Sequence, residues 1–230
     1  MTRYSALTRL LPPFLRRWVL DFEARIDAAV LAFAAALPDD ARVLDAGAGE
    51  ARHASYFRRQ RYTAVDLAVG DAQWDYSRLD AVADLAALPF PTGCFDACVN
   101  IVTLEHVPEP ARALCEMARV LGQGGRLLLV VPHEWEVHQA PHDYFRFTSY
   151  GVEHLLKNAG FTEISIEPAG GFFRLLARRL LNSLQFFPPL LFPIALLLAA
   201  PPALVLPLLD FLDRRRIFTL GYICTARKRC

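Results

Sequence analysis

A nine-residue run near the start of the chain, Arg42–Glu50, places an acid and two glycines at alternate positions. Apolar residues lead into Asp45, and Gly47 and Gly49 follow it. The pattern predicts a buried strand that ends in a tight turn, because glycine lets the backbone turn and approach a ligand closely. A nucleotide is the ligand expected at the carboxyl end of such a strand in a doubly wound sheet.

A second acid is spaced to serve the same ligand. Asp66 ends a predicted strand, Tyr62–Asp66, and lies 21 residues after Asp45. An acid at the end of the second strand can accept hydrogen bonds from ribose hydroxyls. The alternative is an ordinary helix N-cap, a position at which aspartate is also favoured.

Another group of reactive side chains follows the predicted strand Arg126–Val131. Its members are His133, Glu134, Glu136, His138, His142, Asp143, Tyr144 and Arg146. Histidine and carboxylate are the usual general bases, so His138, His142 and Asp143, together with His106 after an earlier strand, are the catalytic candidates. A structural His–Asp pair is the main alternative, and a metal site built from this cluster is a weaker one. We expect no metal.

Several motifs together resemble a known family. A dinucleotide fingerprint would need a third glycine where Arg52 stands. Asp-x-Gly-x-Gly, with Phe95-Asp96 and Leu104-Glu105-His106-Val107 after it, instead resembles class I S-adenosylmethionine (SAM)-dependent methyltransferases. The subgroup it is most similar to methylates small molecules such as quinones and sterols. The family often has a further glycine where this chain has Ala51, and the resemblance covers roughly residues 40–170 and a last strand.

The resemblance implies SAM as the cofactor. In the family the first acid, here Asp45, lies near the methionine end of SAM, and the acid of the adenine loop, here Asp84, receives the adenine amine. The apolar neighbour Leu85 would pack against the adenine ring. The cofactor-binding residues expected on this basis are Asp45, Gly47, Gly49, Asp66, Leu67, Asp84, Leu85 and Asn100.

The expected elements fit an α/β fold, a Rossmann-like seven-stranded doubly wound sheet. Helices are predicted at 14–37, 51–61, 111–121 and 149–158, the last with Thr148 as its N-cap. Besides the strands above, strands are predicted at 95–100, 161–168 and 220–227, and Gly122–Gly125 is expected to end the third helix. The helix at 14–37 would cover the sheet or close the cofactor cleft. Arg3, Arg9, Arg16 and Arg17 offer an alternative contact with an anionic membrane.

The last two strands are separated by a long apolar segment. Thirty residues, 180–209, contain no charge, and they lie between Arg178-Arg179 and Arg214-Arg215-Arg216. Six prolines argue against one continuous helix. Two membrane crossings need about 40 apolar residues, so we expect an interfacial or re-entrant hairpin that contacts the membrane through 172–216. A dimer arm or a lid over the active site is the alternative.

The net charge and the cysteine content argue against several kinds of partner and site. A net charge of +1 gives no overall field for nucleic acid, so we expect no nucleic-acid partner. Five cysteines without a C-x-x-C pair favour neither a disulfide scaffold nor a zinc site, and no signal peptide is expected.

The predicted organisation has four parts: an N-terminal helical segment at 1–40, a SAM-binding core at 41–170, an apolar insertion at 171–216 and the final core strand at 217–230. The function expected is methylation, with a slight preference for O-methylation, of a lipid-linked sugar, a quinone or a similar amphiphile. The protein would lie at the cytoplasmic face of a membrane. The alternative is a methyltransferase-fold binding or assembly protein without catalytic activity.

Overall fold

The computed structural model describes residues 12–229, which form two compact units. Residues 26–167 and 222–229 make up one, called the sheet unit, and residues 12–25 and 168–221 make up the other, called the helical unit. Arg3 and Arg9, two of the arginines considered for contact with an anionic membrane, lie outside the described residues.

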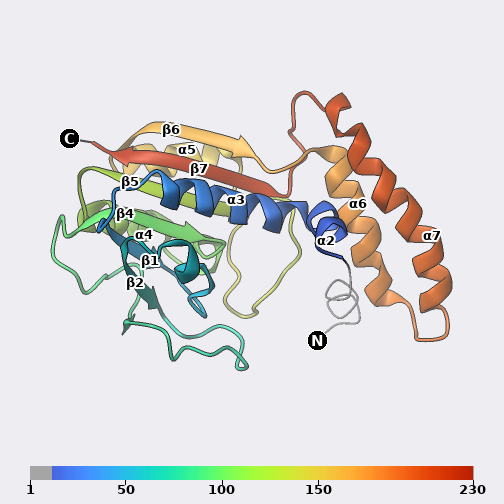
Figure 1. Ribbon diagram of the computed structural model, residues 1–230, viewed down its shortest axis with the longest axis horizontal. Helices are drawn as coiled ribbons and strands as arrows, with labels where there is room; N and C mark the ends of the chain where they lie inside the picture. The colour runs from blue at the N-terminus through green and yellow to red at the C-terminus, as the bar shows by residue number, and fades with distance from the viewer. Residues whose placement is uncertain (1–11, 230) are drawn as a thin grey trace. The chain divides into compact units, whose positions relative to one another are not determined.

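The sheet unit is built on a seven-stranded sheet with the strand order β3-β2-β1-β4-β5-β7-β6. The strands are β1 (Arg42–Ala46), β2 (Arg61–Asp66), β3 (Ala81–Val82), β4 (Phe95–Ile101), β5 (Leu121–Pro132), β6 (Phe161–Pro168) and β7 (Gly221–Lys228). Strands β1 to β5 pair in parallel, and the β7 arrow points opposite to that of β6 in Figure 1. The predicted Rossmann-like doubly wound sheet is confirmed.

The core of this unit lies between the sheet and helices α4 (Pro110–Val120) and α5 (Ser149–Asn158). Helix α5 begins as predicted, because the Thr148 hydroxyl accepts a hydrogen bond from the Gly151 amide at 3.0 Å. Leu114, Met117 and Leu156 are fully buried against strand residues. This packing fixes the strand ends, where the polar side chains discussed below are found.

Two predictions for the sheet unit were wrong in detail. Ala51 takes a left-handed conformation, so the helix predicted at 51–61 is only a short 3-10 helix, η1 (Arg52–Tyr56), closed by i→i+3 bonds. The glycines expected to end α4 instead lie inside β5, where the pairing with β4 shifts between Phe95 and Ala97. A positive φ at Gly124 permits this irregularity.

The helix predicted at 14–37 is two helices, α2 (Pro13–Val19) and α3 (Asp21–Ala35). Leu20 leaves the helical conformation, with φ −100° and ψ 54°. Asp21 and Glu23 then fall in the first turn of α3, where the helix dipole favours negative charge. The helix start at the proline pair was predicted correctly.

The helical unit contains α6 (Phe172–Ser183), η3 (Leu184–Phe186), α7 (Phe192–Val205) and η4 (Leu206–Leu212). Helices α6 and α7 form an antiparallel pair (Figure 1) around a small core of Ala177, Leu181, Leu184, Ala195 and Ala203. Pro201 and Pro202 lie inside α7, so the expectation that the prolines interrupt the segment was wrong at these positions. The lost amide bonds are offset by packing of α7 on α6.

Charged groups tie this helix pair together at one end, called the base of the pair. The Asp210 carboxylate accepts from the Gly171 amide at 3.1 Å, and the Asp213 carboxylate accepts from the Phe172 amide at 2.8 Å. Two aspartates therefore satisfy the amino end of α6, where helix amides lack partners. Arg174 in turn contacts Asp21 at 2.9 Å and Asp210 at 3.5 Å.

Candidate cofactor and acceptor site

The glycine turn after β1 is packed too tightly for side chains. Gly47 has φ +91°, and a Cβ placed there would lie 2.2 Å from the Thr103 Cγ2 atom. The amides of Gly47 and Ala48 both donate to the Val65 carbonyl, and the Gly49 amide donates to Asp66. These amides are used within the protein, so the turn offers close backbone approach rather than amide donors.

Asp66 lies at the end of β2 with both carboxylate oxygens held in place. One oxygen accepts from the Gly49 amide at 2.9 Å, and the other accepts from the Ala68 amide at 2.8 Å. A carboxylate has about four lone-pair positions, so these two bonds leave capacity for further donors. Asp66 is therefore a rigid, partly exposed hydrogen-bond acceptor beside the glycine turn.

Two buried acceptors stand at the ends of β1 and β4. Asp45 is hydrogen-bonded through one oxygen to the Tyr62 hydroxyl, and its other oxygen has no hydrogen-bond partner among the described residues. Burial is the main reason that the pKa of Asp45 rises to about 7. Asn100 donates to the Ala46 carbonyl at 2.6 Å, while its side-chain oxygen, like that of Asp45, lacks a described partner.

The remaining predicted cofactor residues are arranged around the end of β3. The backbone of Ala83 bonds to that of Asp66, which brings the start of the Asp84 loop beside the end of β2. Asp84 is exposed and accepts from the Ala86 amide at 2.8 Å. Leu67 is exposed, but Leu85 is buried in the core of the sheet unit.

Two aromatic side chains, Trp74 and Tyr76, lie near the glycine turn and were not among the predicted site residues. The Trp74 ring would lie 3.2 Å from a Cβ at Gly49, and Tyr76 accepts through its hydroxyl from the Gly70 amide at 2.8 Å. Glu50 also holds this loop, because its carboxylate accepts from the Asp75 amide at 3.1 Å. The alternation of aromatic and acidic residues at 74–76 was the only sequence signal available.

The catalytic candidates form one cluster. The side chains of His106 and His138 meet edge to face, with ring centroids 4.6 Å apart, beside the buried Glu105 carboxylate. His106 Nδ1 lies 2.6 Å from the His142 carbonyl oxygen. The structure therefore brings together the side chains of His106, His138 and Asp143 with the backbone of His142, and it adds Glu105, which the predicted site had left out.

Arg146 organises the loop that carries these histidines. Its guanidinium binds both oxygens of Asp143, at 2.6 and 2.8 Å, and also the carbonyls of Trp135 and Glu136. The charge of Arg146 holds the pKa of the Asp143 carboxyl well below its usual range. Asp143 also accepts from the His138 amide at 2.8 Å, so it orients the loop.

The strand exit that carries Glu105 is strained. Val102 has φ +51°, which is a rare conformation for a β-branched residue and one that clusters at functional sites. The amides of Tyr144 and Phe145 donate to the Glu105 carbonyl at 2.9 and 3.2 Å. Both segments of the cluster are thus fastened to each other through the backbone.

Comparisons with known proteins agree with this geometry. A family model described as a methyltransferase domain matches residues 44–129, and the structure places its glycine turn and acids on one sheet edge. The matched stretch and the fold together support a class I SAM-dependent methyltransferase domain at residues 44–129.

Two curated relatives share part of this chain. A "ubiquinone biosynthesis O-methyltransferase" of Xanthomonas oryzae is 39% identical over 103 residues, which are 39% of this chain and 42% of that protein. A "probable S-adenosylmethionine-dependent methyltransferase" of Mycobacterium tuberculosis is 31% identical over 136 residues, covering 54% of this chain and 50% of the relative. The matched region thus spans about half of each relative or less.

A solved structure shares the fold over nearly the whole chain. The 1,6-didemethyltoxoflavin-N1-methyltransferase of Burkholderia thailandensis, solved with S-adenosylhomocysteine, superposes with a TM-score of 0.54 at 23% identity. The alignment covers 99% of this chain and 89% of that structure. At this identity the likeness concerns the fold alone.

The polar groups on the strand ends fit SAM as a ligand. The cofactor carries an ammonium, two ribose hydroxyls and an adenine amine, which are all hydrogen-bond donors. The methyltransferase domain presents acceptors there: the Asp66 carboxylate, the exposed Asp84 carboxylate and the unpartnered oxygens of Asp45 and Asn100. Buried acceptors without a donor are costly, so a donor-rich ligand matches this edge.

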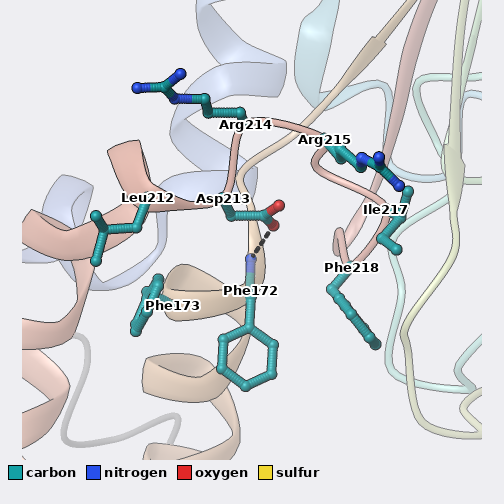
Figure 2. A pocket seen from close by; sticks show the side chains of 8 residues that line it. All are labelled: Phe172, Phe173, Leu212, Asp213, Arg214, Arg215, Ile217 and Phe218. Carbon is teal, nitrogen blue, oxygen red and sulfur yellow. Dashed lines mark hydrogen bonds between the residues drawn. The ribbon is translucent and has the colours of Figure 1, made fainter.

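The helical unit has a separate open cavity of about 620 Å³. Figure 2 shows its lining, with the rings of Phe172 and Phe173 on one side of Asp213 and the chain of Arg214 and Arg215 on the other. The lining residues are Phe172, Phe173, Leu212, Asp213, Arg214, Arg215, Ile217 and Phe218. No ion pair is found for Arg214 or Arg215 within residues 12–229. The lining thus combines apolar rings with one carboxylate and two guanidinium groups.

Proposed function

We propose that this chain is a SAM-dependent methyltransferase that methylates an oxygen atom of a membrane-confined amphiphile, such as a lipid-linked sugar or a quinone. The observation that carries the proposal is the acceptor-rich edge of the sheet together with the histidine cluster on the same edge of the same unit. SAM supplies a methyl carbon that leaves a sulfonium sulfur for the acceptor oxygen, so the products are a methyl ether, a neutral thioether and a proton.

Oxygen is favoured as the acceptor atom because the chain provides bases for a hydroxyl proton. Burial is the main cause that lowers the pKa of His106, which keeps its imidazole neutral and able to accept a proton. His142 is half-buried, and its Nδ1 lies 3.2 Å from the Tyr144 hydroxyl. The Xanthomonas relative is named for O-methylation, which supports the same assignment.

The chain's own residues do the remaining work by positioning. Asp66 would hold the ribose, Asp84 the adenine amine, and Asp45 with Asn100 the ammonium end of the cofactor. Arg146 and Asp143 fix the loop that carries His138 and His142. An in-line methyl displacement gains much of its rate from holding the reactants in such a fixed geometry.

The helical unit supports a membrane-confined acceptor. Its α6–α7 pair has two different ends: the base carries the charged residues Arg174, Asp210 and Asp213, whereas the connecting tip is apolar. At the tip, Phe186 is 80% exposed and Leu190 is 85% exposed. Exposed apolar surface of this extent requires a covering surface.

The length of the apolar stretch favours insertion of the tip. Phe192–Leu212 is one helical stretch of 21 residues that is long and apolar enough to cross a membrane, and only 17% of it is buried. Both ends of the helical pair, however, are bonded together at the charged base. The 21 residues rise about 32 Å at 1.5 Å each, close to the bilayer core of about 30 Å, so the bonded base, and not the length, favours entry and exit on one side.

The cationic residues beside the base support a position on the cytoplasmic face. Arg214, Arg215 and Arg216 follow the apolar stretch directly. Arginines next to membrane segments are enriched on the cytoplasmic side, and each contributes about 1 kcal/mol near an anionic surface. The cavity of Figure 2, rimmed by Arg214 and Arg215, would contact the acceptor's anionic head or a lipid.

Calorimetry with SAM tests the cofactor half of the proposal. We expect the full chain to bind SAM, and Asp66→Ala to weaken binding by at least tenfold, because it removes a charged acceptor. Asp39→Ala is the matched control, since Asp39 lies in an exposed ion pair with Arg59. Absence of heat in the wild-type chain would favour a binding or assembly protein without catalytic activity.

Labelling tests the acceptor half. Membranes from a strain that lacks this protein are incubated with the purified chain and SAM labelled on its methyl group. We expect the label in a lipid extract, as a methyl ether that resists mild base. Label confined to water-soluble products would contradict a membrane-confined acceptor, and a label released by mild base as an ester would contradict a hydroxyl acceptor.

A further inference from the structure

The Glu105 side chain is the most unusual buried group in the sheet unit. It is fully buried, with 0% of the side chain exposed, and neither carboxylate oxygen has a hydrogen-bond partner in the described chain. A buried carboxyl without partners costs free energy. Two imidazole nitrogens lie within 4.0 Å of one of its oxygens.

Those two nitrogens point at the same carboxylate oxygen. His106 Nε2 lies 3.7 Å from Glu105 Oε1, and His138 Nε2 lies 4.0 Å from the same atom. One ligand atom from each residue falls within 4.8 Å of both others. Ligands about 2.1 Å from one ion lie about 3.4 Å apart at a tetrahedral angle, so closing the cluster takes only small shifts.

A hydrogen bond on the far side of the His106 ring fixes which nitrogen is available. His106 Nδ1 is 2.6 Å from the His142 carbonyl, and His138 Nδ1 is 3.1 Å from the Glu136 carbonyl. A carbonyl only accepts, so His106 Nδ1 carries the proton and His106 Nε2 keeps its lone pair, whereas His138 Nδ1 lies near both the Glu136 carbonyl and, at 3.5 Å, the Arg146 guanidinium. Histidine ligands of metal ions are oriented by the arrangement found at His106.

We propose that Glu105, His106 and His138 bind a divalent transition-metal ion, for which Zn²⁺ is the simplest candidate. Two imidazoles and one carboxylate suit Zn²⁺ or a neighbouring first-row ion better than Mg²⁺ or Ca²⁺, which prefer oxygen ligands. A three-residue set leaves coordination positions open. His138, whose side chain is 25% exposed, gives access from solvent.

The site would deepen the proposed function, and this part of the inference rests on it. A divalent cation lowers the pKa of a hydroxyl that it binds, so the acceptor's proton would leave to solvent before the methyl carbon passes from sulfur to oxygen. The substrate class would then be a phenol, an enol or a sugar hydroxyl. Our expectation of no metal, made from the sequence, is replaced by this proposal.

Metal titration of the full chain, stripped with a chelator, tests the site without any activity assay. Zn²⁺ binding is measured by calorimetry, and Co²⁺ binding by its visible absorption. We expect one ion per chain. Glu105→Gln and His138→Ala should each weaken binding at least 100-fold, whereas His154→Ala on α5, an exposed histidine outside the cluster, should leave it unchanged.

Several outcomes would overturn the metal site. They are no stoichiometric binding in the wild-type chain, equal binding in His138→Ala, or a strong near-ultraviolet Co²⁺–thiolate band that assigns the ion to cysteine. SAM calorimetry on the same samples reports whether each variant is folded. It also separates the two hypotheses, because SAM binding without metal binding refutes only the metal site, while metal binding without SAM binding refutes only the proposed function.

Discussion

Proteins usually bury apolar side chains and expose or pair polar groups, and the two units depart from this rule in opposite ways. In the sheet unit, polar atoms of Asp45, Asn100 and Glu105 are buried without hydrogen-bond partners among residues 12–229. In the helical unit, large apolar side chains such as Phe186 and Leu190 are exposed. Polar atoms that lack partners indicate a small ligand with donors or charge, and exposed apolar side chains indicate an extended apolar surface. The first feature therefore supports the proposed ligand chemistry, and the second supports the proposed membrane contact.

The largest expected effect concerns the apolar surface. Replacing Phe186, Leu190, Leu197 and Leu198 by serine removes side chains that would each contribute about 1.5–3 kcal/mol on full burial in lipid. We expect binding to anionic lipid vesicles, measured by co-sedimentation, to fall at least a thousandfold. Leu31→Ser with Tyr150→Ser, both exposed in the sheet unit, is the control and should leave vesicle binding unchanged.

The second effect is a pH dependence set by Glu105. Burial raises the pKa of Glu105 to about 8, so in metal-free protein the folded state keeps a proton that the unfolded state loses near pH 4.5. The free energy of unfolding should therefore decrease as the pH rises from about 4.5 to about 8. Glu105→Gln should be increasingly more stable than wild type across this range, by up to about 4 kcal/mol above pH 8.

Urea denaturation at pH 5, pH 6.5 and pH 8.5 measures that difference. Glu109→Gln is the control, because the Glu109 side chain is exposed. Equal stability of wild type and Glu105→Gln at pH 8.5, in the presence of chelator, would show that burial does not raise the pKa of Glu105.

The third effect isolates the glycine turn. Gly47 and Gly160 have nearly the same φ, +91° and +88°, but only Gly47 lies against a side chain, that of Thr103. Gly160→Ala should cost about 1 kcal/mol of stability through backbone strain alone. Gly47→Ala adds a severe clash, so we expect a loss of about 3 kcal/mol and no measurable SAM binding. Similar melting temperatures for the two variants would contradict this account.

The smallest effect concerns Ala51, where the family often has glycine. Ala51 holds a left-handed conformation at φ +53°, which costs an L-residue about 1 kcal/mol. Ala51→Gly relieves this strain but gives the unfolded chain more freedom and loses a buried methyl. Thermal unfolding should therefore change by less than about 1 kcal/mol, and a loss larger than that would show that the methyl group packs a critical contact.

The sequence predicted the sheet well because its signals are local. Strands β1, β2, β4, β6 and β7 follow apolar runs, and the Thr148 cap precedes α5 as expected. The break at Leu20 and the continuation of α7 through Pro201 depend on ion pairs and packing between distant segments, which no local pattern contains.

Part of the candidate site could be predicted because its residues, too, follow a local pattern in the sequence. Asp66 could be found from its spacing to the glycine turn, and the structure places it against Gly49. The role of Glu105 could not be predicted from the sequence, because its neighbour His138 lies 33 positions further along the chain. Their approach depends on the bonds of Tyr144 and Phe145 to the Glu105 carbonyl, which belong to the tertiary fold.

The segment between β6 and β7 returns to the point where it leaves. The Ala169 amide donates to the Gly221 carbonyl at 2.9 Å, and the Thr219 hydroxyl donates to the Ala169 carbonyl at 3.1 Å. Some fifty residues therefore leave β6 and return to β7 through one closed neck. Because its two ends meet, such an insertion can become longer, become shorter or be replaced during evolution without changing the strand order. Related sheet units could therefore acquire different binding surfaces through changes in this one segment.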